Sequence, residues 1–159
     1  MAREATAALD ELREITHGIH SAVLTTGGLR PALRALARRA PLPVELHLHV
    51  DGRLPEPVET GAYYTVAEAL TNTAKYAHAS AVTITVDATT DSDTTVLRLT
   101  VHDDGIGGAD LTRGTGLLGL KDRAEALGGR IVLHSPRGAG TTLHVELPLT
   151  AANGGVTSR

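Results

Sequence analysis

Two clusters of acidic and glycine residues lie close together in the second half of the chain. Asp103 and Asp104 end an apolar run, and glycines follow them as far as a second glycine cluster at 114–119. The residues that come next are apolar at helical spacing, namely Leu117, Leu120, Ala124 and Leu127. A helix N-terminus presents free N–H groups and a partial positive charge, which suit a phosphate chain. A fixed carboxylate at a strand end and a glycine-rich anion cradle together predict a nucleotide site.

The second cluster, Gly114-Thr-Gly-Leu-Leu-Gly119, spells the glycine pattern of dinucleotide-binding folds. That fingerprint follows a strand directly and has an acidic residue about 20 residues further on. Here the polar stretch 110–113 precedes the glycines, and the downstream stretch 134–140 carries no acid. The glycine-lysine pattern of phosphate-binding P-loops is also absent from the sequence. The sequence therefore argues against a Rossmann or P-loop site.

A second group of polar residues lies on a predicted helix upstream. Glu68, Asn72 and Lys75 are spaced so that they share one helix face, while Val66, Leu70 and Ala77 fall on the opposite face. An acid, an amide and a lysine in line offer a base, a metal-ligand oxygen and a phosphate-binding cation. Taken alone, the pattern favours a solvated helix face with a weak Glu–Lys relation. The neighbouring anion cradle and strand-end carboxylate favour a site.

Four stretches of this sequence occur in the order found in one ATPase superfamily. They are Glu68-Ala-Leu-Thr-Asn72-Thr-Ala-Lys75-Tyr-Ala, Asp103-Asp-Gly-Ile-Gly107, Gly114-Thr-Gly-Leu-Leu-Gly119 and Gly138-Ala-Gly-Thr141. They resemble the N, G1, G2 and terminal glycine-threonine boxes of the GHKL ATPases. More narrowly, the chain looks like the catalytic, ATP-binding end of a bacterial two-component sensor histidine kinase of the nitrate-sensor subclass. The resemblance covers about residues 5–148.

The resemblance implies a nucleobase end of the site. Asp103 would accept the adenine amino hydrogen, with Gly105 and Gly107 beside the base. Thr141 would assist from the last pair of strands through water.

The resemblance also implies a phosphate end, with ATP and Mg²⁺ as cofactors. Asn72 would give Mg²⁺ a side-chain oxygen, Lys75 would contact phosphate oxygens, and Glu68 would be the catalytic base or polarising group. The remaining residues implied to bind the cofactor form a short lid and open the following helix onto the phosphates: Gly114, Gly116, Leu117 and Gly119.

The N-terminal part departs from that family's pattern. Members carry a phosphoacceptor histidine followed by an acidic residue, whereas His17 precedes Gly18 and His20 precedes Ser21. The segment 11–20 resembles instead the end of the second helix of the dimerisation hairpin. We therefore expect an ATP-dependent protein histidine kinase that needs a separate phosphoacceptor hairpin domain and acts with a response regulator. An anti-sigma-factor-type serine kinase and a non-catalytic nucleotide-binding or dimerisation module are the alternatives.

The elements that must position these groups follow from the periodicity of the apolar residues. Helices are predicted at 3–24, 29–40, 58–77 and 117–127, and strands at 44–50, 81–86, 96–101, 131–133 and 143–147. Together they predict an α+β fold of the Bergerat type, a two-layer sandwich with a mixed sheet of about five strands and helices on one face. Residues 1–40 would form N-terminal helices, 41–149 the ATP-binding catalytic domain, and 150–159 a disordered tail. The apolar stripe of the first helix fits packing on its own domain or a homodimer.

Composition excludes several classes of function. The sequence has no cysteine, so disulfides and thiolate metal sites are excluded. A net charge of −3 argues against a nucleic-acid partner. No apolar run approaches about 18 residues, so we expect no membrane contact by this segment. We expect a cytoplasmic location for it, whether or not the full-length protein is anchored in a membrane. His47 and His49 share a strand face with Glu45, and His144 faces outward on another strand; a solvated face is favoured there over zinc chelation.

Overall fold

The computed structural model describes residues 22–112 and 115–149. Residues 22–27 are helical and are separated from the next helix by Gly28. The elements that follow are α2 (Leu29–Arg39), β1 (Val44–His49), α3 (Glu56–Asn72), the π-helix η1 (Thr73–Ala77), β2 (Val82–Asp91), β3 (Thr94–Asp103), α4 (Thr115–Ala126), β4 (Arg130–His134) and β5 (Thr141–Pro148). The predicted tail and most of the predicted first helix lie outside the described residues. The division of the chain at residue 40 stays a prediction.

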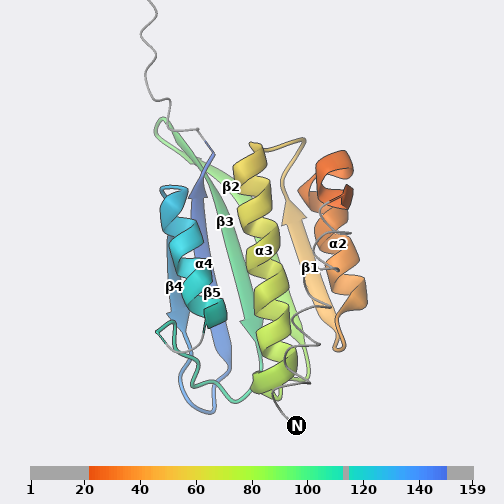
Figure 1. Cartoon of the computed structure of the whole chain (residues 1–159), viewed down its shortest axis with the longest axis vertical. Helices are drawn as coiled ribbons and strands as arrows, with labels where there is room; N and C mark the ends of the chain where they lie inside the picture. Colours follow the sequence, from red (N-terminus) through yellow and green to blue (C-terminus); the bar gives the residue numbers. More distant parts are fainter. Residues whose placement is uncertain (1–21, 113–114, 150–159) are drawn as a thin grey trace, which may run out of the picture.

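The strands form one mixed sheet in the order β1-β2-β3-β5-β4. β1 pairs with β2 in parallel, and the other three pairings are antiparallel. α2, α3 and α4 all lie on the same face of this sheet (Figure 1). The prediction of a two-layer α+β sandwich with a five-stranded mixed sheet is therefore confirmed.

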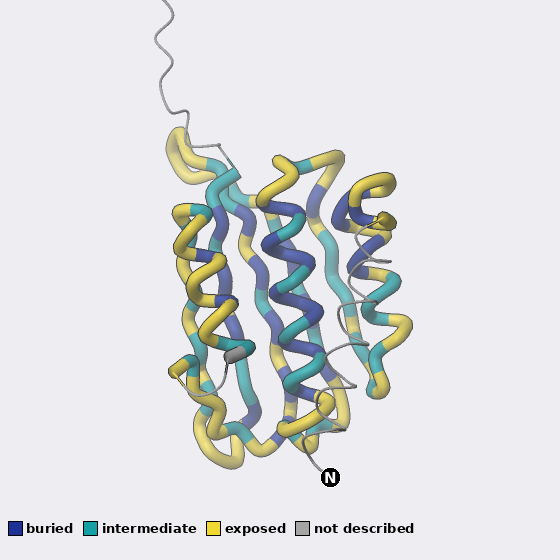
Figure 2. The backbone as a smooth tube through the Cα atoms, viewed as in Figure 1, coloured by how far each residue is buried: buried dark blue, intermediate teal, exposed yellow. Residues whose placement is uncertain are grey.

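The core lies between the helical layer and the sheet. Leu33 of α2, Val66 of α3 and Ile84 of β2 are fully buried, and Leu99 of β3 is 1% exposed. Figure 2 shows buried backbone concentrated where α3 crosses the central strands. Because aliphatic side chains supply most of this core, its stability comes from the area they remove from water, at roughly 25 cal/mol per Å².

Side chains on the other face of the sheet are mostly polar, and they pair both across strands and, for Glu45 and His47, along β1. His49 contacts Asp87 at 2.7 Å, His47 contacts Glu45 at 2.8 Å, and His144 lies 3.2 Å from the Thr100 hydroxyl. In the part of the chain that the structure describes, no three acidic or histidine side chains gather into a candidate metal site.

Two regions differ from the periodicity-based prediction. β2 and β3 run on through the predicted polar connector and turn only at Ser92 and Asp93. Threonines favour extended backbone, and Thr90 and Thr95 place their hydroxyl oxygens 3.0 Å apart across this hairpin.

The long helix predicted at 58–77 begins earlier and ends differently. Pro57 lies in its first turn, where proline is tolerated, and Glu56 adds a favourable negative charge there. At the other end, the N–H of Thr73 bonds to the carbonyls of both Ala69 and Leu70, and the chain continues as a π-turn. The wider turn changes which side of the helix Ala77 lies on. Ala77 therefore lines a cavity, whereas the prediction placed it on the face opposite Glu68.

None of the described helices combines the length and the apolar character needed to cross a bilayer.

Candidate functional site

A cavity of about 610 Å³ opens between the C-terminal end of α3, η1, the end of β3 and the start of α4. Most of the residues predicted from the sequence line it: Glu68, Asn72, Lys75, Asp103, Gly107, Gly116, Leu117 and Thr141. Gly105 and Gly119 are not among the lining residues, and Gly114 lies outside the described residues. Side chains that are far apart in the sequence thus share one cavity.

The Asp103 carboxylate is held at the floor of this cavity. Asp103 is the last residue of β3 and is only 5% exposed. One carboxylate oxygen, Oδ1, accepts a hydrogen bond of 2.9 Å from the N–H of Gly105. The other, Oδ2, lies 3.4 Å from the hydroxyl of Thr73, which also donates to the Ala69 carbonyl at 2.8 Å. The carboxylate is therefore a fixed acceptor facing the cavity.

The loop after Asp103 is fixed on both sides. The N–H of Ile106 donates to the Ala77 carbonyl at 2.8 Å, and the Ile106 carbonyl accepts from the N–H of Gly138 at 2.6 Å. Gly107 has φ +66°, and a side chain there would overlap the Pro136 carbonyl. Only glycine fits this position without strain, so the loop approaches the 135–140 segment closely.

The polar face of α3 forms one wall. Glu68 and Asn72 are both half-buried and are separated by one helical turn. A Cβ at Gly116, in the first turn of α4, would overlap the Glu68 carboxylate. The absence of a side chain at Gly116 therefore lets α4 approach Glu68.

η1 forms the rim of the cavity. Lys75 is exposed, and Tyr76 is 66% exposed beside it. The π-turn ends at His78, whose φ of 49° is left-handed. A π-turn at the end of a helix often marks a functional position.

Thr141 approaches the cavity from β5. It is paired in register with Asp103 on β3, and its hydroxyl lies 2.7 Å from that of Ser135. Ser135 also accepts a 2.9 Å hydrogen bond from the N–H of Ala109. The two hydroxyls therefore link the end of the sheet to the loop that covers the cavity.

Sequence reasoning missed several residues of this site. Thr73, Tyr76 and Ile106 line the cavity, but neither their residue types nor their spacing suggested a role. Asp104 was quoted only as part of a motif, yet it accepts hydrogen bonds from the Ser80 hydroxyl and from the N–H groups of Ser80 and Ala81. These bonds hold the pKa of Asp104 below its usual value. The paired acids thus have separate tasks: Asp103 faces the cavity and Asp104 anchors the start of β2.

Comparisons with known proteins agree with this arrangement. Residues 58–151 match the family described as histidine kinase-, DNA gyrase B- and HSP90-like ATPases. Relatives include the sensor histidine kinase YxjM of Bacillus subtilis, 32% identical over 91% of this chain and 36% of its own length. Another is the oxygen sensor histidine kinase NreB of Staphylococcus carnosus, 27% identical over 89% of this chain and 42% of its own length. The chain thus spans roughly two fifths of these relatives.

The fold is also found in a solved structure, the histidine kinase domain of the Erythrobacter litoralis EL346 blue-light activated histidine kinase. It superimposes with a TM-score of 0.59 at 21% identity, covering 77% of this chain and 60% of that one. At that identity the likeness shows the fold alone. The family match extends over more than half of the chain and includes every box on which the predicted resemblance rests. The chain belongs to the family of histidine kinase-, DNA gyrase B- and HSP90-like ATPases.

Proposed function

We propose that the cavity binds ATP with Mg²⁺ and that the chain donates the γ-phosphoryl group to a histidine of a phosphoacceptor hairpin in two-component signalling. One observation carries this proposal: Glu68 and Asn72 on α3 share a single cavity with the buried Asp103 carboxylate of β3. The volume of about 610 Å³ lies within the range of small-ligand pockets.

The buried end of the cavity suits the adenine base. Asp103 Oδ1 is occupied by the Gly105 N–H, and Oδ2 is the oxygen nearer Thr73. A fixed carboxylate oxygen selects a ligand with an N–H donor, as adenine has in its amino group. Thr141 supplies a hydroxyl nearby, and Gly107 also lines the cavity.

The open end suits the phosphates. Lys75 supplies a cation at the rim, and the N-terminus of α4 supplies a positive dipole end. Mg²⁺ is held in nucleotide sites by one or two protein oxygens together with phosphates, and Asn72 offers such an oxygen. When bound, the ion would neutralise phosphate charge.

Glu68 is the group we propose to act on the acceptor. Its carboxylate lies at the cavity wall beside the first turn of α4. There it can accept a proton from one ring nitrogen of an incoming imidazole while the other nitrogen attacks the γ-phosphorus and ADP leaves. General-base assistance of this kind contributes roughly 10²–10⁴-fold to a rate.

The acceptor histidine is expected from another segment or chain. Among the residues that the structure describes, no histidine lines the cavity. His17 and His20 lie outside the described residues. We place the reaction in the cytoplasm, with a response regulator as the next acceptor.

Calorimetric titration with ATP, in the presence and absence of Mg²⁺, tests the binding. We expect Asn72→Ala to weaken Mg-ATP by about tenfold or more, as loss of metal-site groups does, with a smaller effect on metal-free ATP. Thr71→Ala is the matched control, because Thr71 bonds only to the helix carbonyl of Ala67 and does not line the cavity. Equal losses in both conditions would rule out Asn72 as a metal ligand.

Transfer is tested with γ-labelled ATP and a separately supplied hairpin. We expect acid-labile label on that hairpin and none on a hairpin whose histidine is replaced. Acid-stable label on a serine would favour the anti-sigma-factor type of kinase.

A further inference from the structure

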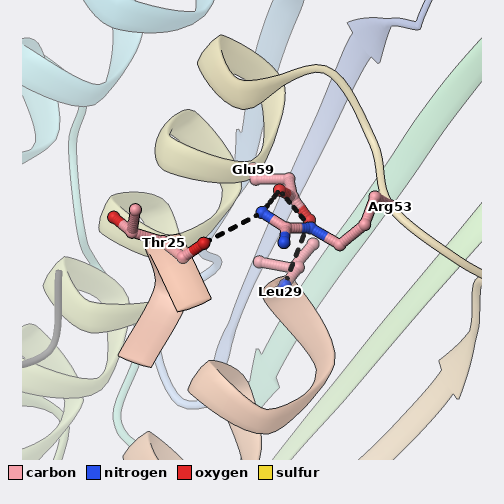
Figure 3. A network of polar contacts seen from close by, with 4 residues as sticks. All are labelled: Thr25, Leu29, Arg53 and Glu59. Atoms are coloured by element: carbon pink, nitrogen blue, oxygen red, sulfur yellow. Dashed lines mark hydrogen bonds and ion pairs between the residues drawn. The ribbon is translucent and has the colours of Figure 1, made fainter. Parts of the chain in front are cut away.

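A second carboxylate of α3 is buried at the end of the helix away from the cavity. Glu59 lies in the first turn and is 2% exposed, although it does not line the cavity. Burying a carboxylate is costly unless charged or hydrogen-bonding groups surround it. Figure 3 shows Arg53 and Leu29, which contact the carboxylate, and Thr25, which contacts Arg53.

The contacts of Glu59 join separate segments of the chain. Oε1 accepts hydrogen bonds from Arg53, at 3.2 Å from Nε and 3.0 Å from Nη2. Oε2 accepts one of 3.1 Å from the N–H of Leu29, the first residue of α2. Arg53 Nη2 also reaches the carbonyl of Thr25 at 3.4 Å. The Glu59 carboxylate thus joins α3 to the loop after β1 and to the start of α2, and Arg53 extends the network to the 22–27 helix.

The glycine between the two N-terminal helices makes this contact possible. Gly28 has φ +87°, and a Cβ there would lie 2.9 Å from Arg53 and 3.2 Å from Glu59 Oε2. Gly28 offers α2 no side-chain cap, and the first turn of α2 contains no acidic residue. Glu59, 30 residues away in sequence, supplies the negative charge that a helix N-terminus favours.

α3 therefore links the Glu59 network at its N-terminal end to the cavity residue Glu68 near its C-terminal end. Glu59 is nine residues before Glu68, which is about 13 Å along a straight helix. Leu24 of the 22–27 helix is also buried in the core, so packing and polar contacts act together.

We propose that Arg53 and Glu59 are positioning residues that lock the 22–27 helix at one angle to α3. Through α3, this lock fixes how the 22–27 helix is directed relative to Glu68 and Asn72. The functional consequence rests on the proposed phosphoryl transfer, because transfer depends on the orientation of donor and acceptor. The lock itself does not depend on any ligand.

Spin labels test the lock in the 159-residue chain, which has no native cysteine. Cysteines replace Val23, on the 22–27 helix, and Val132, on β4; these are 37% and 53% exposed. Pulsed dipolar spectroscopy then reports the distribution of distances between the two labels. We expect one narrow peak in the parent, and a distribution roughly twofold wider or a shifted peak in Arg53→Met and Glu59→Gln. Arg53→Lys, which keeps the charge but loses the planar fork, should be intermediate.

The controls separate the lock from general destabilisation. Glu146→Gln removes a carboxylate paired with Arg130 and Arg98 on the open sheet face, and should leave the distribution unchanged. Arg53 is half exposed, so Arg53→Met should fold even if Glu59→Gln does not. Superimposable distributions in the folded parent and Arg53→Met would overturn the proposal.

ATP titration separates this proposal from the proposed function. Neither Arg53 nor Glu59 lines the cavity, so we expect ATP affinity in Arg53→Met to stay within about twofold of the parent. A parent that binds no ATP would contradict the proposed function and leave the spectroscopic result standing. A Glu59 variant that lost ATP affinity without any change in the distance distribution would contradict the lock.

Discussion

A glutamate lies near each end of α3, and the two side chains have different surroundings. Glu59 is 2% exposed and is surrounded by an arginine fork and a helix N-terminus. Glu68, on the same helix, is half-buried and borders a cavity of about 610 Å³. The first carboxylate is buried among groups of the protein, whereas the second also borders a space that a ligand can fill. Surroundings, rather than residue type, separate structural from chemical carboxylates.

The backbone of α3 also differs between the end at Glu59 and the end near the cavity. The first turn of α3 is regular and carries proline and acidic residues that suit a helix start. The last turn widens into η1, which places Lys75 and Tyr76 at the cavity rim. Regular geometry is kept where the helix is anchored and given up where the cavity opens.

Substitution of the two glutamates should give the largest contrast. Glu68→Gln keeps the shape but removes the base, so we expect transfer to a supplied hairpin to fall by roughly 10²–10⁴-fold. Glu59→Gln should instead lower the free energy of unfolding by about 1–3 kcal/mol, because a buried charge-assisted contact is weakened. Transfer rates and chemical denaturation of both variants make the comparison. Similar losses of transfer rate in both would erase the proposed distinction.

The paired acids after β3 offer a smaller contrast. Asp103→Asn exchanges an acceptor for a donor at the adenine end, and should weaken ATP binding by about tenfold to hundredfold. Asp104→Asn is the matched control, because Asp104 bonds to Ser80 and Ala81 and does not line the cavity. Calorimetry should show near-parent affinity for Asp104→Asn. Unchanged ATP binding in Asp103→Asn would remove the nucleobase role.

Substitution of two glycines, Gly116 and Gly119, tests whether close packing of α4 against Glu68 matters for transfer. A methyl group at Gly116 overlaps the Glu68 carboxylate, whereas nothing lies within 4 Å of one at Gly119. Gly116→Ala should displace that carboxylate and slow transfer about tenfold. Gly119→Ala should keep ATP affinity within about twofold and stabilise α4 slightly. A slower transfer in Gly119→Ala alone would show that backbone freedom at Gly119, rather than the contact of Gly116 with Glu68, limits the reaction.

The smallest effect on stability is expected from the exposed pair Arg130–Glu146, in contrast to the pair Arg53–Glu59, whose carboxylate is buried. The hydrogen bond from Arg130 holds the pKa of Glu146 below its ordinary 4.5. A carboxyl with a lowered pKa adds stability above its unfolded pKa and loses it as pH falls through the folded pKa. Glu146→Gln should therefore cost less than about 1 kcal/mol at pH 7, and nothing once pH is below the folded pKa. Denaturation curves at pH 7 and in acid check this; a cost that persists in acid would point to packing.

The residue types of the site could be predicted because each box is local in sequence. Glu68, Asn72 and Lys75 were grouped by helical spacing. Predicted elements whose apolar periodicity is clear lie within two residues of those observed, as at 29–40, 44–50, 117–127, 131–133 and 143–147. The strand-end position of Asp103 likewise followed from the apolar run before it. These features depend on neighbours within a few residues, which the sequence displays directly.

Only the tertiary structure determined which polar groups become hydrogen-bond or ion-pair partners. Arg53 and Leu29 meet Glu59, and Thr73 meets Asp103, across separations of up to 30 residues. Periodicity carries no record of such pairs, nor of the π-turn at Thr73–Ala77 that accompanies the position of Ala77 at the cavity. The chain thus specified locally what its side chains can do. Packing of the helical layer on the sheet then determined which of them face a ligand and which are buried in the protein, because burial is a property of the assembled layers.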